Sequence, residues 1–195
     1  KIIDSTKNMY VVQLSKNHSA YLEKIYAKED TTATIKPYYL TNSWSVKGVV
    51  DSFDVVSMSM EEKLPYKIWM ETNPNKIMVQ LYGVQSNTNW ITQLQTAKEV
   101  KSIYFNQTED DVITATIELN HNQHWGFTAA YKNKTLTIKI KQQPKDLAVK
   151  DLLIAIDAGH GGSNTGASGI KSGVLEKNST LLFAKELEKQ LKKKG

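Results

Sequence analysis

The sequence contains neither cysteine nor arginine among its 195 residues. Without cysteine, disulfides, thiolate catalysis and cysteine-ligated zinc are excluded, and the absence fits a secreted chain that avoids stray thiols. All 25 basic residues are lysines, so the guanidinium fork with which proteins read base edges and phosphates is missing. No apolar run approaches the roughly 20 residues of a membrane-spanning helix. Nucleic-acid recognition and a transmembrane segment are therefore not expected.

The formal net charge of +5 is concentrated at one end of the chain. Residues 177–195 hold six lysines against Glu186 and Glu188, which leaves a net charge of only +1 for all other residues. Lysines are favourable at the carboxyl end of a helix because they oppose its dipole. The basic cluster therefore predicts a solvated helix terminus rather than a binding patch.

Proline and glycine are also scarce over most of the chain. Residues 10–141 have a residue pattern typical of β-strands. β-Branched and aromatic residues alternate with polar ones, most clearly in "TLTIKIK", where Leu136, Ile138 and Ile140 share one face. Short, regularly spaced strands without intervening helices predict a mostly β protein with an antiparallel, sandwich-like N-terminal region. The expected strands are "YVVQL", "GVVDSFDVVSMSM", "YKIWME", "KIMVQLYG", "VKSIYF", "DVITATIEL", "WGFTAAY" and "TLTIKIK".

The pattern changes after a polar segment at 145–151, which we interpret as a linker. "LLIAI" (152–156) is a continuous apolar run, as expected of a buried parallel strand. A glycine-rich loop follows, and then residues 179–194 have helical spacing, with Asn178 or Ser179 as the expected cap. The order strand, loop, helix predicts the opening unit of an α/β domain.

The glycine-rich loop gathers six of the ten glycines between Gly159 and Gly173, around His160 and ahead of Glu176. A phosphate-binding loop is not expected, because Ala167 stands where a Walker motif needs its phosphate-contacting lysine. The dinucleotide fingerprint fails as well, since Asn164 occupies its third glycine position. An imidazole and a carboxylate are suitable zinc ligands, and His160 would follow the carboxyl end of the predicted strand. A histidine in such a loop is also a common structural turn residue, and both interpretations remain open on spacing alone.

The segment "IAIDAGHGGSNTGASGIKSGVLEKNSTLLFAKELEKQL" resembles the start of the zinc-dependent N-acetylmuramoyl-L-alanine amidases of the amidase-3 type. The resemblance implies that His160 and Glu176 are the first two zinc ligands and that Gly161, Gly162 and Asn164 belong to the substrate-facing loop. The family commonly has aspartate at position 164, and we expect this departure to affect loop hydrogen bonding more than metal binding. The implied reaction is hydrolysis of the amide between N-acetylmuramic acid and L-alanine of the peptidoglycan stem peptide.

In that family the third ligand, a histidine, and the catalytic glutamate lie further downstream. We therefore expect no catalytic residue within this chain, and a 195-residue protein that is inactive and holds Zn²⁺ poorly. We also expect self-association through the truncated amidase segment, 152–195. The rival interpretation is a non-catalytic module that binds peptidoglycan or the cell wall.

Residues 44–144 resemble the AMIN-type β-domains that precede such amidases, and residues 1–43 resemble the end of a small wall-associated barrel. These resemblances imply an envelope location, periplasmic or extracellular, with a signal peptide already removed. Three smaller candidates have plainer explanations. We interpret His121 and His124 as turn residues, Glu109, Asp110 and Asp111 as a solvated turn, and the tryptophans as core residues more than a sugar-stacking platform.

Overall fold

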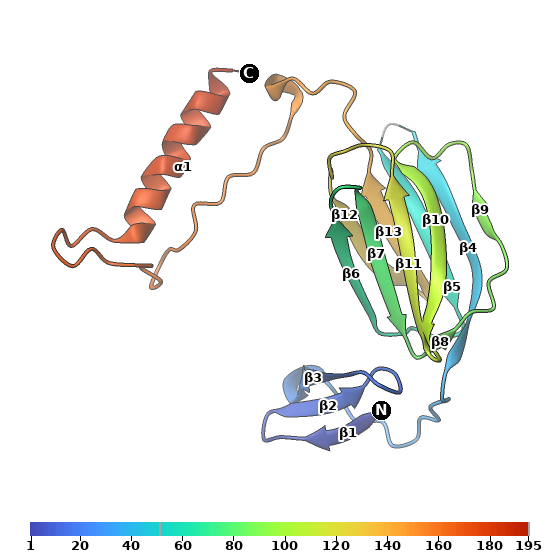
Figure 1. Cartoon of the computed structure of the whole chain (residues 1–195). Helices are drawn as coiled ribbons and strands as arrows, with labels where there is room; N and C mark the ends of the chain where they lie inside the picture. Colours follow the sequence, from blue (N-terminus) through green and yellow to red (C-terminus); the bar gives the residue numbers. More distant parts are fainter. Residues whose placement is uncertain (51, 195) are drawn as a thin grey trace. The chain divides into compact units, whose positions relative to one another are not determined.

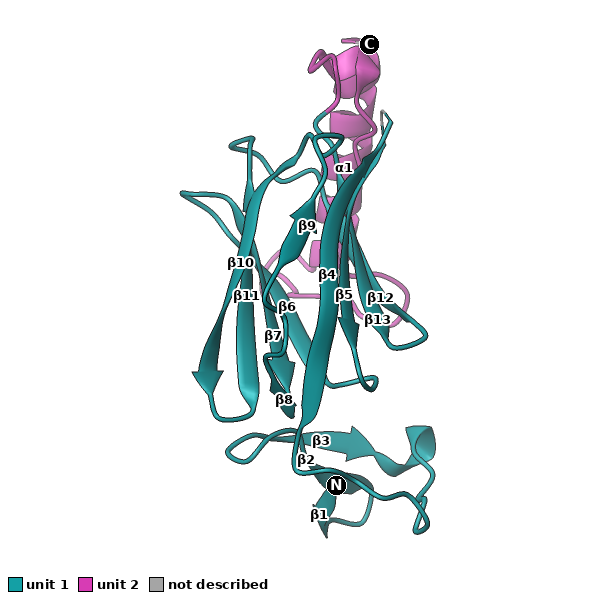
Figure 2. Cartoon of the chain, turned by 90° about the vertical axis from the view of Figure 1, so that its right-hand side faces the viewer, with its two compact units in different colours: residues 1–143 teal, residues 144–195 magenta. Residues whose placement is uncertain are grey.

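The computed structural model describes residues 1–50 and 52–194 and divides the chain into two compact units, residues 1–143 and 144–195 (Figure 2). The first unit contains all the strands, and the second contains the one α-helix assigned in the described residues. None of the helices in these described residues is long and apolar enough to cross a membrane. The mostly β character with antiparallel sheets, predicted from the alternation, is confirmed.

A small three-stranded antiparallel sheet opens the first unit, in the order β1-β2-β3 (Figure 1). It comprises β1 (Ile2–Ser5), β2 (Met9–Gln13) and β3 (Ser19–Glu23), and a 3-10 turn (Lys24–Tyr26) follows. Only the middle strand was expected from the sequence. Its neighbours are short and largely exposed, so they lack the buried face that produces a clear alternation.

Two larger sheets face each other in the rest of the first unit (Figures 1 and 2). One has the order β10-β11-β7-β6, and the other has the order β12-β13-β5-β4-β8, with β9 paired to β4. Most pairings are antiparallel, but β8 and β9 both run parallel to β4. The strands are β4 (Tyr39–Val49), β5 (Phe53–Met60), β6 (Tyr66–Glu71), β7 (Lys76–Tyr82), β8 (Val84–Gln85), β9 (Ile91–Gln93), β10 (Val100–Glu109), β11 (Val112–Leu119), β12 (Phe127–Lys132) and β13 (Thr135–Lys141).

Period-two alternation builds the core between these sheets. Leu136, Ile138 and Ile140 point inward from β13 and are essentially fully buried, as "TLTIKIK" predicted. They pack in one cluster with residues of the facing sheet such as Val79 and Ile117. Each such side chain contributes roughly 1.5–3 kcal/mol by leaving water, so the apolar stripe of each strand fixes which face turns inward.

One inward position of the core is charged. Asp54 lies on β5 in register with buried Val56 and Met58, and it is fully buried. Its carboxylate accepts hydrogen bonds from the backbone N–H groups of residues 98, 99 and 100 and from Nε2 of Gln142, at 2.7–3.1 Å. These four donors replace the water that the carboxylate loses, and they tie the start of β10 to the opposite sheet.

The second unit differs from the expected strand, loop and helix. Residues 152–156 form no strand, so that expectation is wrong for this structure. A strand needs a neighbour to take its backbone hydrogen bonds, and the described part of this unit has no sheet to supply one. The arrangement of an α/β amidase domain is therefore not observed.

The helix of the second unit forms, but it starts earlier than expected. α1 spans Glu176–Lys192, and the residue at its amino-terminal cap is Leu175, with no side-chain hydrogen bond. Asn178 and Ser179, the expected caps, lie inside the first turn instead. The extra residues are held by the preceding loop, since the Glu176 and Lys177 N–H groups donate to carbonyls of Ala167 and Thr165.

Candidate metal centre

The glycine-rich loop folds back so that His160 meets the first residue of α1. His160 Nε2 lies 3.4 Å from Glu176 Oε2, although the two residues are separated by sixteen positions. Both side chains are partly exposed, at 34% and 42%. The sequence-predicted pair is therefore brought together at an accessible place.

Glycine is required at position 166 for this meeting. A Cβ atom built there would lie 2.7 Å from Glu176 Oε2 and 2.9 Å from His160 Cδ2, and the backbone φ is +65°. Both the close approach and the left-handed backbone suit glycine alone. His160 itself has a positive φ of 55°, which is uncommon for a residue with a side chain and is characteristic of functional sites.

Each of the two side chains is oriented by a hydrogen bond within the loop. The Glu176 carboxylate accepts the Ala167 N–H at 2.8 Å through the same Oε2 that faces the imidazole. His160 Nδ1 lies 3.1 Å from Asn164 Oδ1, and the Gly166 N–H donates to that oxygen as well. Asn164 thus touches the candidate ligand directly, in addition to the loop bonding expected of it.

The start of α1 holds the loop in place through residues that carried no assigned role in the sequence. Lys177 Nζ donates to the Gly162 carbonyl at 2.9 Å, and Thr180 Oγ1 donates to the Gly159 carbonyl at 3.4 Å. Asp157 Oδ1 accepts the Gly159 N–H at 3.0 Å. Gly161 exchanges two backbone hydrogen bonds with Asn164. In the sequence, only their position could have identified Lys177 and Thr180 as residues that hold the loop, since they lie one and four residues after the predicted ligand Glu176.

The geometry of the pair suits a tetrahedral metal. Two ligand atoms that each lie about 2.0–2.1 Å from a tetrahedral zinc are about 3.3–3.4 Å apart, which matches the observed separation of 3.4 Å. Within the described part of the chain, no three His, Cys, Asp or Glu side chains gather in a group that could hold a metal ion. His160 and Glu176 therefore fit two positions of a zinc site and leave the other positions to other groups.

The other histidine pair is structural. His121 Nδ1 lies 2.7 Å from Glu99 Oε2, and His124 Nε2 lies 3.0 Å from the Glu71 carbonyl oxygen. Glu99 is buried and its Oε2 also accepts the Gln143 N–H. The two imidazoles thus serve different partners, in agreement with their interpretation as turn residues.

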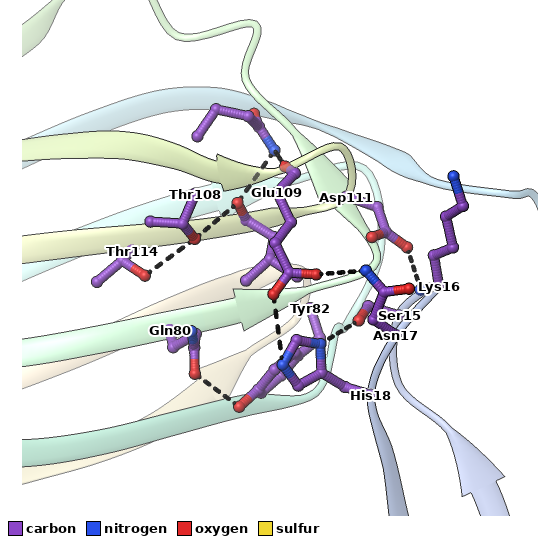
Figure 3. A network of polar contacts seen from close by, with 12 residues as sticks. Ser15, Lys16, Asn17, His18, Gln80, Tyr82, Thr108, Glu109, Asp111 and Thr114 are labelled. Atoms are coloured by element: carbon purple, nitrogen blue, oxygen red, sulfur yellow. Dashed lines mark hydrogen bonds and ion pairs between the residues drawn. The ribbon is translucent and has the colours of Figure 1, made fainter.

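The acidic turn between β10 and β11 is not merely solvated, which corrects the expectation for residues 109–111. Asp111 is only 7% exposed and accepts the Lys16 N–H at 2.7 Å (Figure 3). Glu109 accepts a hydrogen bond from Asn17 and lies 3.5 Å from His18 Nε2. The turn therefore docks the loop of residues 15–18, and this connection between distant segments left no local signal in the sequence.

His18, which the sequence left without a role, completes that contact. Its Nδ1 lies 2.7 Å from Ser15 Oγ, and its ring packs 5.1 Å from the ring of Tyr82 (Figure 3). A cleft of about 760 Å³ beside this network is lined by Tyr38, Tyr39 and Asp111, among others. The cleft lies in the first unit and is lined by neither candidate metal ligand. It is therefore separate from the candidate metal centre.

The tryptophans differ in their burial. Trp44 is 1% exposed and packs in the core, whereas Trp90 is 74% exposed. Trp69 donates a hydrogen bond to Glu71 on β6. Core packing, the use expected of these residues, is thus observed for Trp44 but not for Trp90.

Comparison with known proteins supports the interpretation of the loop. Residues 154–195 match the family described as N-acetylmuramoyl-L-alanine amidase. Two curated relatives, each named probable cell wall amidase LytH, come from two strains of Staphylococcus epidermidis, ATCC 35984 and ATCC 12228. Each is 44% identical to this chain over 71 residues, which is 36% of this chain and 24% of the relative.

The chain thus spans about a quarter of the length of the curated relatives it matches. The family match contains both His160 and Glu176 and the whole loop between them. These similarities support an amidase of the amidase-3 type at the level of the family.

Proposed function

We propose that the C-terminal unit supplies two zinc ligands, His160 and Glu176, to a peptidoglycan hydrolase. The reaction is cleavage of the amide between N-acetylmuramic acid and L-alanine of the stem peptide. The observation that carries the proposal is the 3.4 Å approach of His160 Nε2 to Glu176 Oε2, inside the segment that matches the amidase family. The separation is the one that two ligands of a tetrahedral zinc adopt.

The residues of this chain bind and orient in the proposed reaction. Zinc, when bound, polarises a scissile carbonyl and brings the pKa of a bound water close to neutrality. His160 and Glu176 hold the metal, and the Ala167 N–H fixes the carboxylate. The side-chain-free backbone at Gly161 and Gly162 leaves open space beside the ligands, which allows a substrate to approach closely.

The chain by itself is proposed to be inactive. A catalytic zinc site uses three protein ligands and keeps a fourth position for water, and the described residues bring only two together. Catalysis would need a third ligand and a general base in addition to this pair. Zinc binding to the chain alone is accordingly expected to be weak.

A graft tests the proposed role directly. Residues 154–195 would replace the matching segment of the Staphylococcus epidermidis relative, and release of stem peptide from purified cell walls would be measured. The graft should retain zinc-dependent hydrolysis, and His160→Ala or Glu176→Ala within it should reduce turnover by at least about 1000-fold because a ligand is lost.

The matched control is Asn178→Ala, which lies in the same helix turn and has no side-chain hydrogen bond to the pair. It should leave turnover nearly unchanged. Turnover that persists after loss of either proposed ligand, or that resists removal of zinc by a chelator, would show that this pair does not hold the metal.

A non-catalytic wall-binding module is the second candidate. It is supported by the independent core of residues 39–141, which gives the N-terminal unit a stable fold of its own. We propose an AMIN-like role for residues 44–144, namely location of the protein at the cell envelope against peptidoglycan. If the graft is inactive while the full chain sediments with purified cell walls, the binding module is favoured.

Self-association through residues 152–195 is proposed on the basis of exposed apolar side chains. Leu182 and Phe183 are 70% and 74% exposed on α1, and Ile170 in the loop is fully exposed. Contiguous exposed apolar surface drives association. Sedimentation velocity should show a concentration-dependent dimer that Leu182→Ser with Phe183→Ser weakens, whereas Lys193→Ser should have no effect.

A further inference from the structure

We propose that Asn164 is a positioning residue that places the proton of the neutral His160 imidazole on Nδ1 and leaves Nε2 free to bind a metal. The inference rests on the proposed function only in taking His160 as a ligand. It is carried by the two hydrogen bonds that converge on Asn164 Oδ1, each 3.1 Å long.

The first step concerns which atom of the Asn164 amide faces the loop. Oxygen and nitrogen of an amide are distinguished by their hydrogen-bond partners. The Gly166 N–H points at this atom, and a backbone N–H can only donate. The atom must therefore be an acceptor, which identifies it as the oxygen.

The second step follows for the imidazole. An amide oxygen accepts and cannot donate, so His160 Nδ1 must carry the proton in the 3.1 Å contact. In the neutral ring the other nitrogen then has a lone pair, and this nitrogen is the one 3.4 Å from Glu176 Oε2. Metal-binding histidines commonly have their second nitrogen held in this way.

The third step is electrostatic. In that tautomer the Nε2 lone pair faces the Glu176 carboxylate at 3.4 Å with no hydrogen between them, and a cation in the gap would be attracted to both groups. The Ala167 N–H satisfies the carboxylate from one side and holds it in that position. Asn164 thus prepares a two-ligand site before any metal arrives, and it does so with a neutral group that adds no charge.

The tautomer is directly observable in the 195-residue chain. In water, a neutral histidine side chain favours the proton on Nε2, so the proposed state is the opposite of the unperturbed one. We would record long-range proton–nitrogen correlations of the ¹⁵N-labelled, metal-free chain at about pH 9, where imidazole side chains are neutral. His160 should show the Nδ1–H pattern.

Two variants and a control separate positioning from folding. Asn164→Ala should move His160 toward the Nε2–H pattern, and Asn164→Asp, which keeps an acceptor, should restore Nδ1–H. Asn178→Ala should leave the pattern unchanged. The amide signals of Gly161 and Gly166 report whether the loop is retained in each variant.

Zinc alone provides a second measurement, by competition with a chromophoric chelator. Asn164→Ala should weaken zinc binding by about 10–100-fold, the usual effect of losing such a partner, and Asn164→Asp should recover it. A wild-type His160 in the Nε2–H form, or a pattern insensitive to Asn164→Ala, would overturn the inference. Since the tautomer is read without metal or substrate, its outcome is independent of whether the grafted segment supports hydrolysis.

Discussion

In residues 39–141 the inward-facing apolar side chains of each strand are covered by the opposite sheet, whereas no described residue of 144–194 is buried. The sandwich holds Leu136, Ile138 and Ile140 at 0–2% exposure, yet Leu153 in the other unit is 98% exposed. The segment at 152–156 is apolar at every position, whereas "TLTIKIK" is apolar only at alternate positions. The difference shows that an apolar run becomes a strand only where other strands are available to pair with it.

The two units are also stabilised by different interactions. The sandwich depends on packing and on a few buried polar groups, while the loop of the second unit is held by short-range hydrogen bonds to the start of α1. Hydrogen bonds exposed to water contribute little net free energy, and buried ones contribute more. Substitutions should therefore have large effects in the first unit and mainly local effects in the second.

The largest effect is expected for Asp54→Ala in the sandwich. The substitution leaves three backbone N–H groups and the Gln142 amide without their buried acceptor. We expect the free energy of unfolding to fall by about 3–5 kcal/mol. Tryptophan fluorescence during urea unfolding measures this change selectively, because all four tryptophans lie in the first unit.

Asp30→Ala is the matched control for that prediction. Asp30 is exposed and accepts hydrogen bonds from nearby Thr32 in the same turn, so its removal should not shift the unfolding midpoint. Equal midpoints for the two variants would mean that the buried carboxylate does not join the sheets.

A pair of identical substitutions compares the two units directly. Leu136→Ala removes a fully buried side chain and should cost about 2–5 kcal/mol of unfolding free energy. Leu182→Ala removes a side chain that is 70% exposed and should change stability by about 0.5 kcal/mol or less. Urea titrations followed by fluorescence and by circular dichroism measure both. A large cost at Leu182 would mean that the helix is packed against another part of the protein in solution.

The same contrast explains how much of the fold could be predicted. Strand β13 occupies the residues expected for it, because one buried face gives it a clear alternation. Strand β6 also occupies its expected residues, although none of them is fully buried. β8 and β9 were not expected, since two or three residues are too few to show a period. The predicted strand at 152–156 is absent because its apolar residues specify burial without specifying a partner.

The residue types of the candidate site and their order along the chain could be predicted from the sequence. His160 and Glu176 were identified, and their approach depends on Gly166, whose special role is visible only once the chain is folded. Asn164 was expected to matter for the loop, but its contact with His160 required the structure. The docking of His18 and Asp111 joins segments more than ninety residues apart, and no local pattern encodes such a pairing.

A smaller effect is expected at alkaline pH, and only in the sandwich. Burial raises the pKa of Tyr131 from 10.0 to about 12, although the Leu64 N–H, which donates to the phenolic oxygen, opposes the shift. Between these two values the unfolded state has lost the phenolic proton and the folded state retains it, so stability falls as the pH rises. Tyr131→Phe should flatten this decline relative to wild type in fluorescence-monitored urea titrations. An unchanged pH slope would show that the phenol is solvated.

The smallest effect is expected at acidic pH, in the helix of the second unit. A hydrogen bond from Lys192, at 2.6 Å, lowers the pKa of Glu188 below 4.5, and the charges of Lys192 and Lys185 act in the same direction. A lowered pKa means that the folded helix favours the carboxylate. Its stabilisation is present above pH 4.5 and is lost as the pH falls through the lowered value. The contribution of Glu188 to stability thus rises with pH, whereas that of Tyr131 falls with pH.

Far-UV circular dichroism isolates this response, because α1 is the one α-helix in the residues that the structure describes. In wild type the helical signal should decrease slightly as the pH falls. Glu188→Gln should make this decrease slightly smaller, and Lys192→Gln should make it smaller by the same amount. Because both substitutions break the same interaction, the double variant should change the acid-induced decrease in helical signal no more than either single variant does. Additive losses would mean that the two side chains act separately on the helix. An exposed ion pair on a helix surface stabilises the helix only slightly and is screened by salt. The difference between wild type and these variants should therefore disappear in concentrated salt. The stabilisation by the buried hydrogen bonds of Asp54 should persist there.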